Sequence, residues 1–162
     1  MSVVRVHAEP LVTDITASDQ CDSLVQFCVT RFGKVDIAVC NARIGIHAPA
    51  TTMLDEDWAQ VMAVSLSGYF NVARSAGRQM IAHKGGSIIA VSANSSEVGY
   101  AELTAIASAK GGVDQMCRNL AVEWGPYAIR VNSINPGLQS TFLQPVKWRQ
   151  GWPLTMTKTF AP

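Results

Sequence analysis

Short apolar runs alternate with stretches of helical periodicity along this chain, and no other feature of the sequence limits its fold as strongly. Largely apolar runs occupy residues 35–40, 87–92 and 129–134, as expected of strands that are covered on both faces. Helical stretches at about 55–83 and 104–124 follow the first two runs, and both end at glycine-containing turns. A chain in which strands and helices alternate in this way builds a parallel sheet with helical crossovers.

A further helix and a further short strand are predicted ahead of the first apolar run. The helix begins at Ser18, a residue that can cap it, and ends at Gly33. Its apolar side chains recur at i, i+3, i+4, i+7, i+8 and i+11 on one face: Cys21, Leu24, Val25, Cys28, Val29 and Phe32. Residues 11–13 are predicted to form a short strand leading to Asp14, so the sheet is expected to have about four strands.

The composition argues against several classes of protein. The 162 residues suffice for one domain with a core, but not for two. Only 15% of them are charged, against about 25% in ordinary domains, so much surface is expected to be buried in the core or against a partner subunit. The net charge is +1 without a basic run, which argues against nucleic acid as a partner. No apolar stretch approaches the roughly 20 residues of a membrane span, and no signal-peptide pattern is seen.

The four cysteines have no CxxC pair and fall inside predicted helices or strands. We interpret them as reduced, buried thiols, not as a disulfide framework or a metal site. Reduced thiols suit a cytoplasmic protein, and no metal site is expected.

Six segments, in order and at matching spacing, resemble the short-chain dehydrogenase/reductase family. They are Thr13-Asp14-Ile15, FGKVDIAVCNA (32–42), DEDWAQVMAVSLSGYFNVARSAGRQM (55–80), GGSIIAVS (85–92), ASAKGGV (107–113) and IRVNSINPGLQST (129–141). The resemblance implies a doubly wound Rossmann-like α/β fold with a nicotinamide cofactor at the strand ends. Because right-handed crossovers place the predicted helices on one face, we expect a partial sheet of this kind with its helices mainly on that face.

The chain departs from the family pattern around the cofactor. No Gly-rich turn is found ahead of residue 13, and Arg43 stands where the family's Asn-Asn-Ala-Gly turn has its glycine. By resemblance, Asp14, Asn41 and Thr141 are the candidate remnant of the cofactor site. Each also has a plainer interpretation: helix capping by Asp14, hydrogen bonds between strand ends by Asn41, and an inherited loop residue for Thr141.

The family's catalytic tetrad maps onto Lys110 and three altered positions. The tyrosine position is Ile106, the serine position is Ala93, and the asparagine position is Ser65. In the family the tyrosine is the acid/base, the serine polarises the carbonyl and the asparagine supports a proton relay. An isoleucine has no proton to exchange, and losing one general acid/base costs about 10²- to 10⁴-fold in rate. We therefore predict a truncated, degenerate member that has lost NAD(P)-dependent hydride transfer and needs no cofactor.

These losses favour a non-redox enzyme of the lyase, isomerase or cyclase type, or a small-molecule binder, that uses the family's substrate cleft. Its candidate catalytic residues are Lys110, Tyr100 and Ser95; the last two lie in the loop before the lysine helix. His47 follows the altered glycine turn and can reach the same cleft. Two alternatives stay open: a non-catalytic oligomeric accessory protein or relic, and an NAD(P)-dependent short-chain oxidoreductase. Whether the chain is an enzyme is left undecided.

Besides a small molecule, the expected partner is a second copy of the chain. By resemblance, the helices at about 55–83 and 104–124 pair across a two-fold axis into a homodimer or a homotetramer. Seven apolar side chains on these helices offer surface for this contact: Trp58, Met62, Tyr69, Phe70, Met116, Leu120 and Trp124. Residues 1–141 are expected to form the Rossmann-like domain. Residues 142–162 are expected to be an irregular tail that packs on the domain or on a partner subunit.

Overall fold

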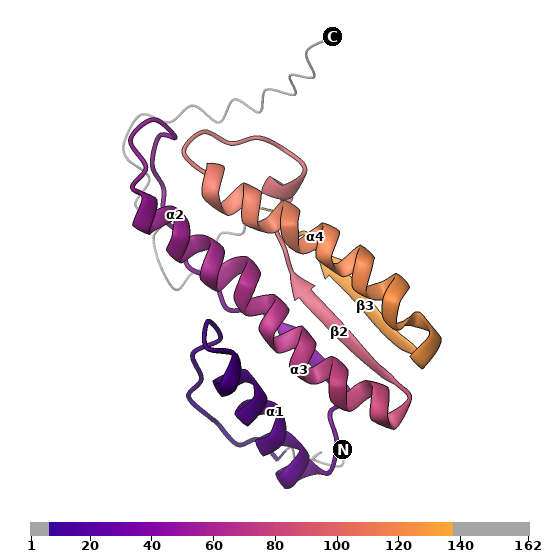
Figure 1. Cartoon of the computed structure of the whole chain (residues 1–162). Helices are drawn as coiled ribbons and strands as arrows, with labels where there is room; N and C mark the ends of the chain where they lie inside the picture. Colours follow the sequence, from indigo (N-terminus) through magenta and orange to yellow (C-terminus); the bar gives the residue numbers. More distant parts are fainter. Residues whose placement is uncertain (1–6, 138–162) are drawn as a thin grey trace, which may run out of the picture.

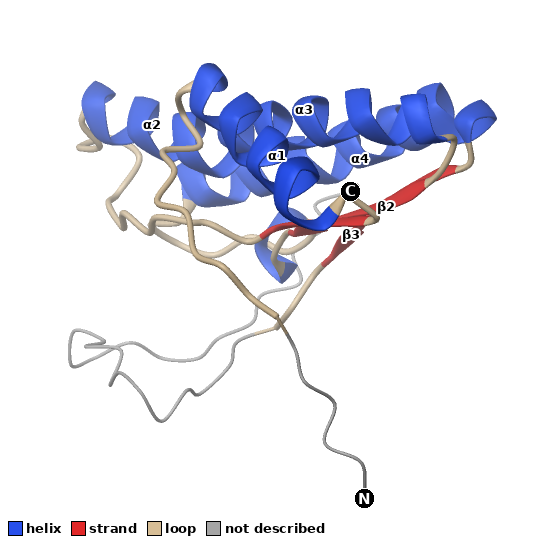
Figure 2. Ribbon diagram, turned by 90° about the horizontal axis from the view of Figure 1, so that it is seen from below, coloured by secondary structure: helices blue, strands red, loops and turns tan. Residues whose placement is uncertain are grey.

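A computed structural model describes residues 7–137, which form a layer of helices over one face of a parallel sheet (Figure 1, Figure 2). The sheet has the strand order β1-β2-β3, with β1 at Ile37–Cys40, β2 at Gly86–Val91 and β3 at Ile129–Ile134. Both strand pairs are parallel. The predicted Rossmann-like α/β fold, with its helices on one face, is confirmed.

The described residues contain three strands, not the four or so that were expected. Residues 11–13 lie outside any strand, and Val12 is fully exposed. The segment runs directly into a local turn, in which the Ala17 amide donates to the Asp14 carbonyl (3.1 Å). A strand persists only where a neighbouring strand offers a hydrogen-bond ladder. The prediction of a strand at 11–13 is wrong.

The helices follow the periodicity of the sequence. The long stretch at 55–83 consists of α2 (Asp55–Met62), the π-helical segment η1 (Ala63–Ser67) and α3 (Gly68–His83). The second long helix, α4, spans Thr104–Trp124. Short 3-10 turns flank it: η2 (Asn94–Ser96) comes before it and η3 (Gly125–Tyr127) directly after it.

The remaining helix, α1 (Ser18–Phe32), begins without the cap that was expected. Ser18 is its first residue, and Ala17 before it makes no capping hydrogen bond. Ser18 Oγ instead accepts a hydrogen bond from Arg74 Nη2 (2.6 Å), so its hydroxyl ties α1 to α3. The expected end of the helix is confirmed, because Gly33 follows at a φ of 87° that suits a residue without a Cβ.

The main core lies between the helices and the covered face of the sheet. Its strand residues are Cys40, Ile88, Ala90, Ile129 and Val131. Its residues from α3 and α4 recur every three or four positions: Tyr69, Ala73, Ala76, Met80, Val113, Cys117, Leu120 and Trp124. The two helices approach closely, since a Cβ on Gly77 would lie 2.7 Å from Trp124 Cη2. The four cysteines are free thiols, three of them buried.

The opposite face of the sheet is open in the part of the chain that the structure describes (Figure 2). Ile37 and Val39 of β1 are 63% and 58% exposed, and Ile134 of β3 is 49% exposed. The tail at 142–162, which we expected to pack on the domain or on a partner, lies outside the described residues. Its packing stays a prediction.

Three of the seven side chains assigned to a subunit interface belong to the core of the chain itself. Tyr69 is fully buried, and Leu120 and Trp124 are each 7% exposed, because they face the sheet and the neighbouring helix. Trp58 and Phe70 keep 39% and 40% of their surface. Self-association therefore rests on a smaller apolar surface than expected and stays a prediction. Within residues 7–137, no helix combines the length and the apolar character needed to cross a membrane.

Candidate active site

The carboxyl ends of the three parallel strands lie at one edge of the sheet, which is where ligands bind in doubly wound folds. The loop of residues 41–54 follows β1, η2 follows β2, and Asn135 follows β3. The first turns of α4 stand beside these loops (Figure 1).

Lys110 is the best-defined residue of this region. It is only 3% exposed, and its ammonium donates to the Val91 carbonyl (2.6 Å) and to Tyr69 Oη (3.1 Å). Lys110 Nζ also lies 4.4 Å from the centroid of the Tyr69 ring. At the base of the side chain, Ser92 Oγ donates to the Lys110 carbonyl (3.1 Å). The lysine is thus held at the end of β2 and is not the solvated residue typical of a helix rim.

Burial changes the proton affinities of this lysine and its tyrosine. Burial, supported by the positive charge of Arg43, lowers the pKa of Lys110 to about 8, while Asp114 opposes this change. Burial also raises the pKa of Tyr69 to about 12. At neutral pH, Tyr69 is therefore a neutral phenol, which donates to the Val91 carbonyl (3.2 Å) and accepts from the lysine. Lys110 exchanges its proton closer to neutrality than an ordinary lysine.

Sequence reasoning missed Tyr69 as a site residue. It was assigned to a subunit interface because it is aromatic and lies on a helix. Its spacing from Ala73, Ala76 and Met80 places all four on the buried stripe of α3. That stripe was the available signal.

The asparagine position of the family lies on the π-helical segment. Ser65 is 1% exposed on η1, and its hydroxyl has no hydrogen-bond partner among the described residues. π-Helical turns inside α-helices are frequent at functional sites. The sequence predicted an uninterrupted helix here and not the π-helical segment.

The tyrosine position has apolar surroundings. Ile106 packs in a second cluster with Ile44 and Ile46 of the loop after β1 and with buried Ala105 and Ala109 of α4. Isoleucine suits this place because the loop closes over it with apolar side chains. At the serine position, Ala93 is extended and leads directly into η2.

Of the other candidate catalytic residues, neither hydrogen-bonds to Lys110 in the described part of the chain. Tyr100 is half-buried, and its hydroxyl accepts a hydrogen bond from Asn94 Nδ2 (2.6 Å). Ser95 is buried at 7% exposure within η2. Tyr100 keeps access to solvent, whereas the Ser95 hydroxyl has little.

The candidate cofactor residues lie apart from this cluster. Asp14 is exposed, and its Oδ1 accepts hydrogen bonds from the Thr16 amide (2.9 Å) and hydroxyl (2.7 Å), which lower the pKa of the carboxyl. It therefore stabilises the turn before α1, although it does not cap that helix. Asn41 is exposed directly after β1. Thr141 lies outside the described residues.

A polar network that the sequence did not predict joins the loops after β2 and β3. Asn135 Nδ2 donates to Glu97 Oε1 (2.9 Å), Ser96 Oγ (3.1 Å) and Asp114 Oδ2 (3.2 Å). Burial by itself raises the pKa of Asp114, but side-chain donors, the Ser96 hydroxyl and the Asn135 amide among them, lower it overall. The network fixes η2 against α4, and thereby shapes the carboxyl edge.

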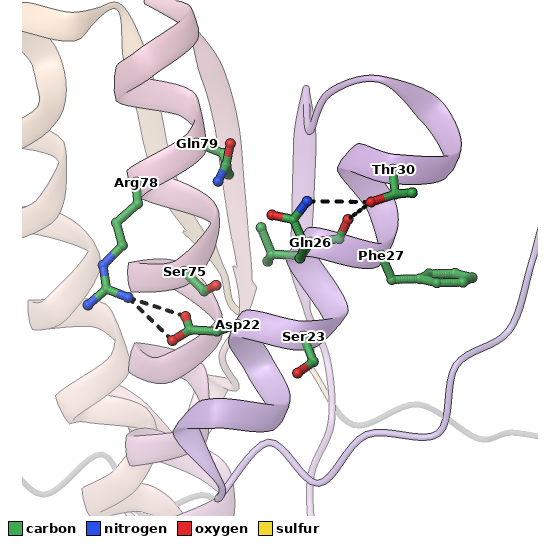
Figure 3. Close-up of a pocket in the computed structure, with 9 residues that line it drawn as sticks. Asp22, Ser23, Gln26, Phe27, Thr30, Ser75, Arg78 and Gln79 are labelled. Carbon is green, nitrogen blue, oxygen red and sulfur yellow. Dashed lines mark hydrogen bonds and ion pairs between the residues drawn. The ribbon is translucent and has the colours of Figure 1, made fainter.

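The described residues also form a groove away from this edge. It has a volume of about 600 Å³, lies between α1 and α3, and is crossed by the pair of Arg78 Nη1 and Asp22 Oδ1 (3.3 Å; Figure 3). None of the residues around Lys110 lines it. Within residues 7–137 there is also no group of three or more His, Cys, Asp or Glu side chains that could hold a metal ion.

The fold and the buried lysine at the strand ends define a doubly wound α/β protein with its site at the carboxyl edge. A family model described as short chain dehydrogenase matches residues 2–151, and the chain belongs to that family. It is 36% identical over 133 residues to the 3-oxoacyl-[acyl-carrier-protein] reductase FabG of Thermotoga maritima, covering 82% of this chain and 54% of that protein. It is 30% identical over 146 residues to the 5-keto-D-gluconate 5-reductase of Escherichia coli, covering 87% and 58%.

Solved structures agree with this assignment. A gluconate 5-dehydrogenase from Burkholderia cenocepacia, in complex with NADP and tartrate, matches with a TM-score of 0.77 at 33% identity, over 79% of this chain and 50% of that chain. NAD+-bound xylitol dehydrogenase matches with a TM-score of 0.77 at 31% identity, over 78% and 49%. The chain spans about half the length of the relatives it matches.

These relatives overturn the prediction that hydride transfer has been lost. Proteins named as reductases and dehydrogenases are similar to this chain over most of its length, and they point to oxidoreductase function. The prediction relied on Ile106, Ala93 and Ser65, and assumed that the proton must come from the family's own positions. Acid/base groups can reach the same space from other loops, so the substitutions do not carry that conclusion. The expectation that no cofactor is needed rested on the same assumption.

Proposed function

We propose that this protein is an NAD(P)-dependent oxidoreductase that transfers a hydride between a nicotinamide cofactor and a small carbonyl or hydroxyl compound. The observation that carries the proposal is Lys110, the family lysine, held at the carboxyl end of β2 with a lowered pKa. Burying a lysine ammonium costs stability, and such a cost is typical of functional residues. The names of the relatives support the same reaction class.

The described residues fit a nicotinamide cofactor at this edge. The Lys110 ammonium has three N–H donors, and the Val91 carbonyl and Tyr69 hydroxyl accept two of them. The third is available to a ribose hydroxyl. Asp14 and Asn41, which lie apart from Lys110, are both exposed. When bound, the cofactor supplies or accepts the hydride; these side chains bind and orient it.

The test is hydride transfer measured by the absorbance of NADH and NADPH at neutral pH. The full chain is offered keto acids, keto sugars, polyols and 3-oxoacyl thioesters. Lys110→Ala is expected to lower kcat/KM by about 10²-fold or more, as for other acid/base and positioning groups. The matched control is Lys34→Ala, which removes an exposed lysine paired with Asp36. Absence of turnover and of NAD(P)H binding in the wild-type chain contradicts the proposal.

We also propose that the chain associates with itself through α2, α3 and α4. Support comes from Trp58 and Phe70, which stay 39% and 40% exposed on these helices, and from the low charged fraction of 15%. Light scattering at micromolar concentration is the measurement. A dimer or tetramer that dissociates on Phe70→Glu supports this interface, and a monomeric wild-type chain contradicts it.

We also propose that the protein resides in the cytoplasm, which suits its free cysteine thiols.

A further inference from the structure

Three side-chain ends converge over Gly45, beside the altered tyrosine position. A Cβ built on this glycine would lie 3.8 Å from Arg43 Nη1, 3.8 Å from His47 Nε2 and 3.9 Å from Ile106 Cδ1. The guanidinium, the imidazole and the isoleucine tip therefore border the same small space. Gly45, Arg43 and His47 are all exposed, so this space is open to solvent. A polar pair thus stands where the family places its phenol.

We propose that the proposed oxidoreductase acts on a small oxo acid, with Arg43 binding the substrate carboxylate and His47 exchanging the proton of the carbonyl oxygen. This inference rests on the proposed function and names its substrate class and its acid/base. It assigns to the loop after β1 the chemistry that Ile106 on α4 cannot perform.

The charge at this place favours an anion. The positive charge of Arg43 favours the deprotonated forms of both Lys110 and Tyr69. A guanidinium binds a carboxylate through two parallel hydrogen bonds, which also fix its orientation. A cleft lined by one sign of charge attracts ligands of the opposite sign. An uncharged ketone has no carboxylate with which the Arg43 guanidinium could pair.

The imidazole suits the proton transfer. Histidine is the side chain that most readily exchanges a proton near neutral pH, and it is the commonest general acid/base in enzymes. Ile106, with Ile44 and Ile46 around it, provides an apolar floor that excludes water from one side of the reacting carbonyl.

In the direction of reduction, a bound dihydronicotinamide would supply a hydride to the carbonyl carbon, and the π-electron pair of the C=O bond would move to oxygen. His47, as an imidazolium, gives its Nε2 proton to that oxygen. The products are a hydroxy acid, the oxidised nicotinamide and a neutral imidazole, which takes a proton back from water. Oxidation runs through the same steps in reverse.

Binding without a cofactor tests the carboxylate site. The full chain is titrated calorimetrically with 2-oxoglutarate and with its dimethyl ester, which keeps the ketone and masks both charges. Arg43→Gln is expected to weaken binding of the acid by about 10- to 100-fold, the usual worth of a charged hydrogen bond, and to leave ester binding unchanged. Arg118→Gln, an exposed arginine on α4 bonded to Gln115, is the matched control. Equal binding of acid and ester by the wild-type chain overturns the oxo-acid assignment.

The place of His47 is tested by NMR of the imidazole signals. Arg43 borders the same space, and the Ala48 amide next to His47 donates to the Glu102 carbonyl (3.2 Å). Added 2-oxoglutarate is expected to change the chemical shifts of the His47 imidazole and to leave those of His83, at the end of α3, unchanged. Unmoved His47 signals overturn its role. Binding without NAD(P)H turnover counts against the oxidoreductase function, and leaves the anion site standing.

Discussion

Replacing Lys110 by methionine should remove a pH dependence of stability that the buried ammonium creates. The structure places this pKa at about 8, against 10.5 for an ordinary lysine. Each tenfold change in proton affinity is worth about 1.4 kcal/mol, so the folded state bears a cost of roughly 3 kcal/mol when the lysine is charged. Methionine has a similar length and no charge, so it removes that cost.

The direction of this pH dependence follows from the pKa of Lys110 in the folded chain and in the unfolded chain. Between pH 8 and 10.5 the unfolded chain holds the lysine proton and the folded chain has released it. The free energy of unfolding must therefore rise with pH in this window, while below pH 8 the full cost is present. From pH 7 to pH 9 the expected gain is about 1 kcal/mol in the wild-type chain. The Lys110→Met chain should show none of it.

The assay is urea unfolding of both chains at several pH values from 7 to 9. Only the difference between the two chains is informative, because burial raises the pKa of the Cys40 thiol to about 12 and of the Cys117 thiol to about 11. These thiols lower stability above about pH 9 in both chains. Lost hydrogen bonds to Val91 and Tyr69 add an offset that does not vary with pH in this range. Two curves that run parallel from pH 7 to 9 refute the buried ammonium.

Two further perturbations test the packing and the polar network. Gly77→Ala should destabilise the fold by about 1–3 kcal/mol, since its Cβ would lie 2.7 Å from Trp124 Cη2. A Cβ on Gly111 would meet no atom within 4 Å, so Gly111→Ala should stabilise the fold by up to about 1 kcal/mol. Thermal melting that shifts both variants in the same direction contradicts this assignment. Asp114→Asn should lose about 1–3 kcal/mol at neutral pH, because an amide donor then faces donors such as the Asn135 amide. Since the pKa of Asp114 is lowered, its contribution is fully present above the unfolded pKa of about 4 and is lost as the pH falls through the lower folded pKa. The difference in stability between the variant and wild type should therefore narrow with increasing acidity; a difference that stays constant contradicts it.

The fold was accessible from the sequence because its signals are local. The apolar stripe of α1 and its glycine end, and the buried runs of β2 and β3, each depend on residues a few positions apart. The prediction of a strand at 11–13 was wrong because it, too, relied on a local pattern. A three-residue segment carries almost no periodic signal, and whether it forms a strand depends on a neighbour that the local pattern does not contain.

The site was accessible only in part, because burial of a polar side chain depends on its partners. Lys110 and Asp114 each directly follow a position of the apolar stripe of α4, which includes Ala109 and Val113. From sequence, such border positions are compatible with either solvent or the interior. Lys110 can be buried because the Tyr69 hydroxyl accepts a hydrogen bond from its ammonium. Tyr69 lies on another helix, 41 residues away in sequence. No spacing rule connects the two.

The π-helical segment η1 determines which way the rest of the long helix faces. The buried positions Val61, Tyr69 and Met80 lie on one stripe that runs 19 residues along the chain in five turns, whereas five regular turns take 18 residues. The wider π turn at Ala63–Ser67 takes up the extra residue. Deleting one residue there would leave 18 residues, the length of five regular turns, so a regular helix could keep Tyr69 and Met80 on the same stripe. What the deletion would remove is the π turn itself, on which the buried Ser65 lies.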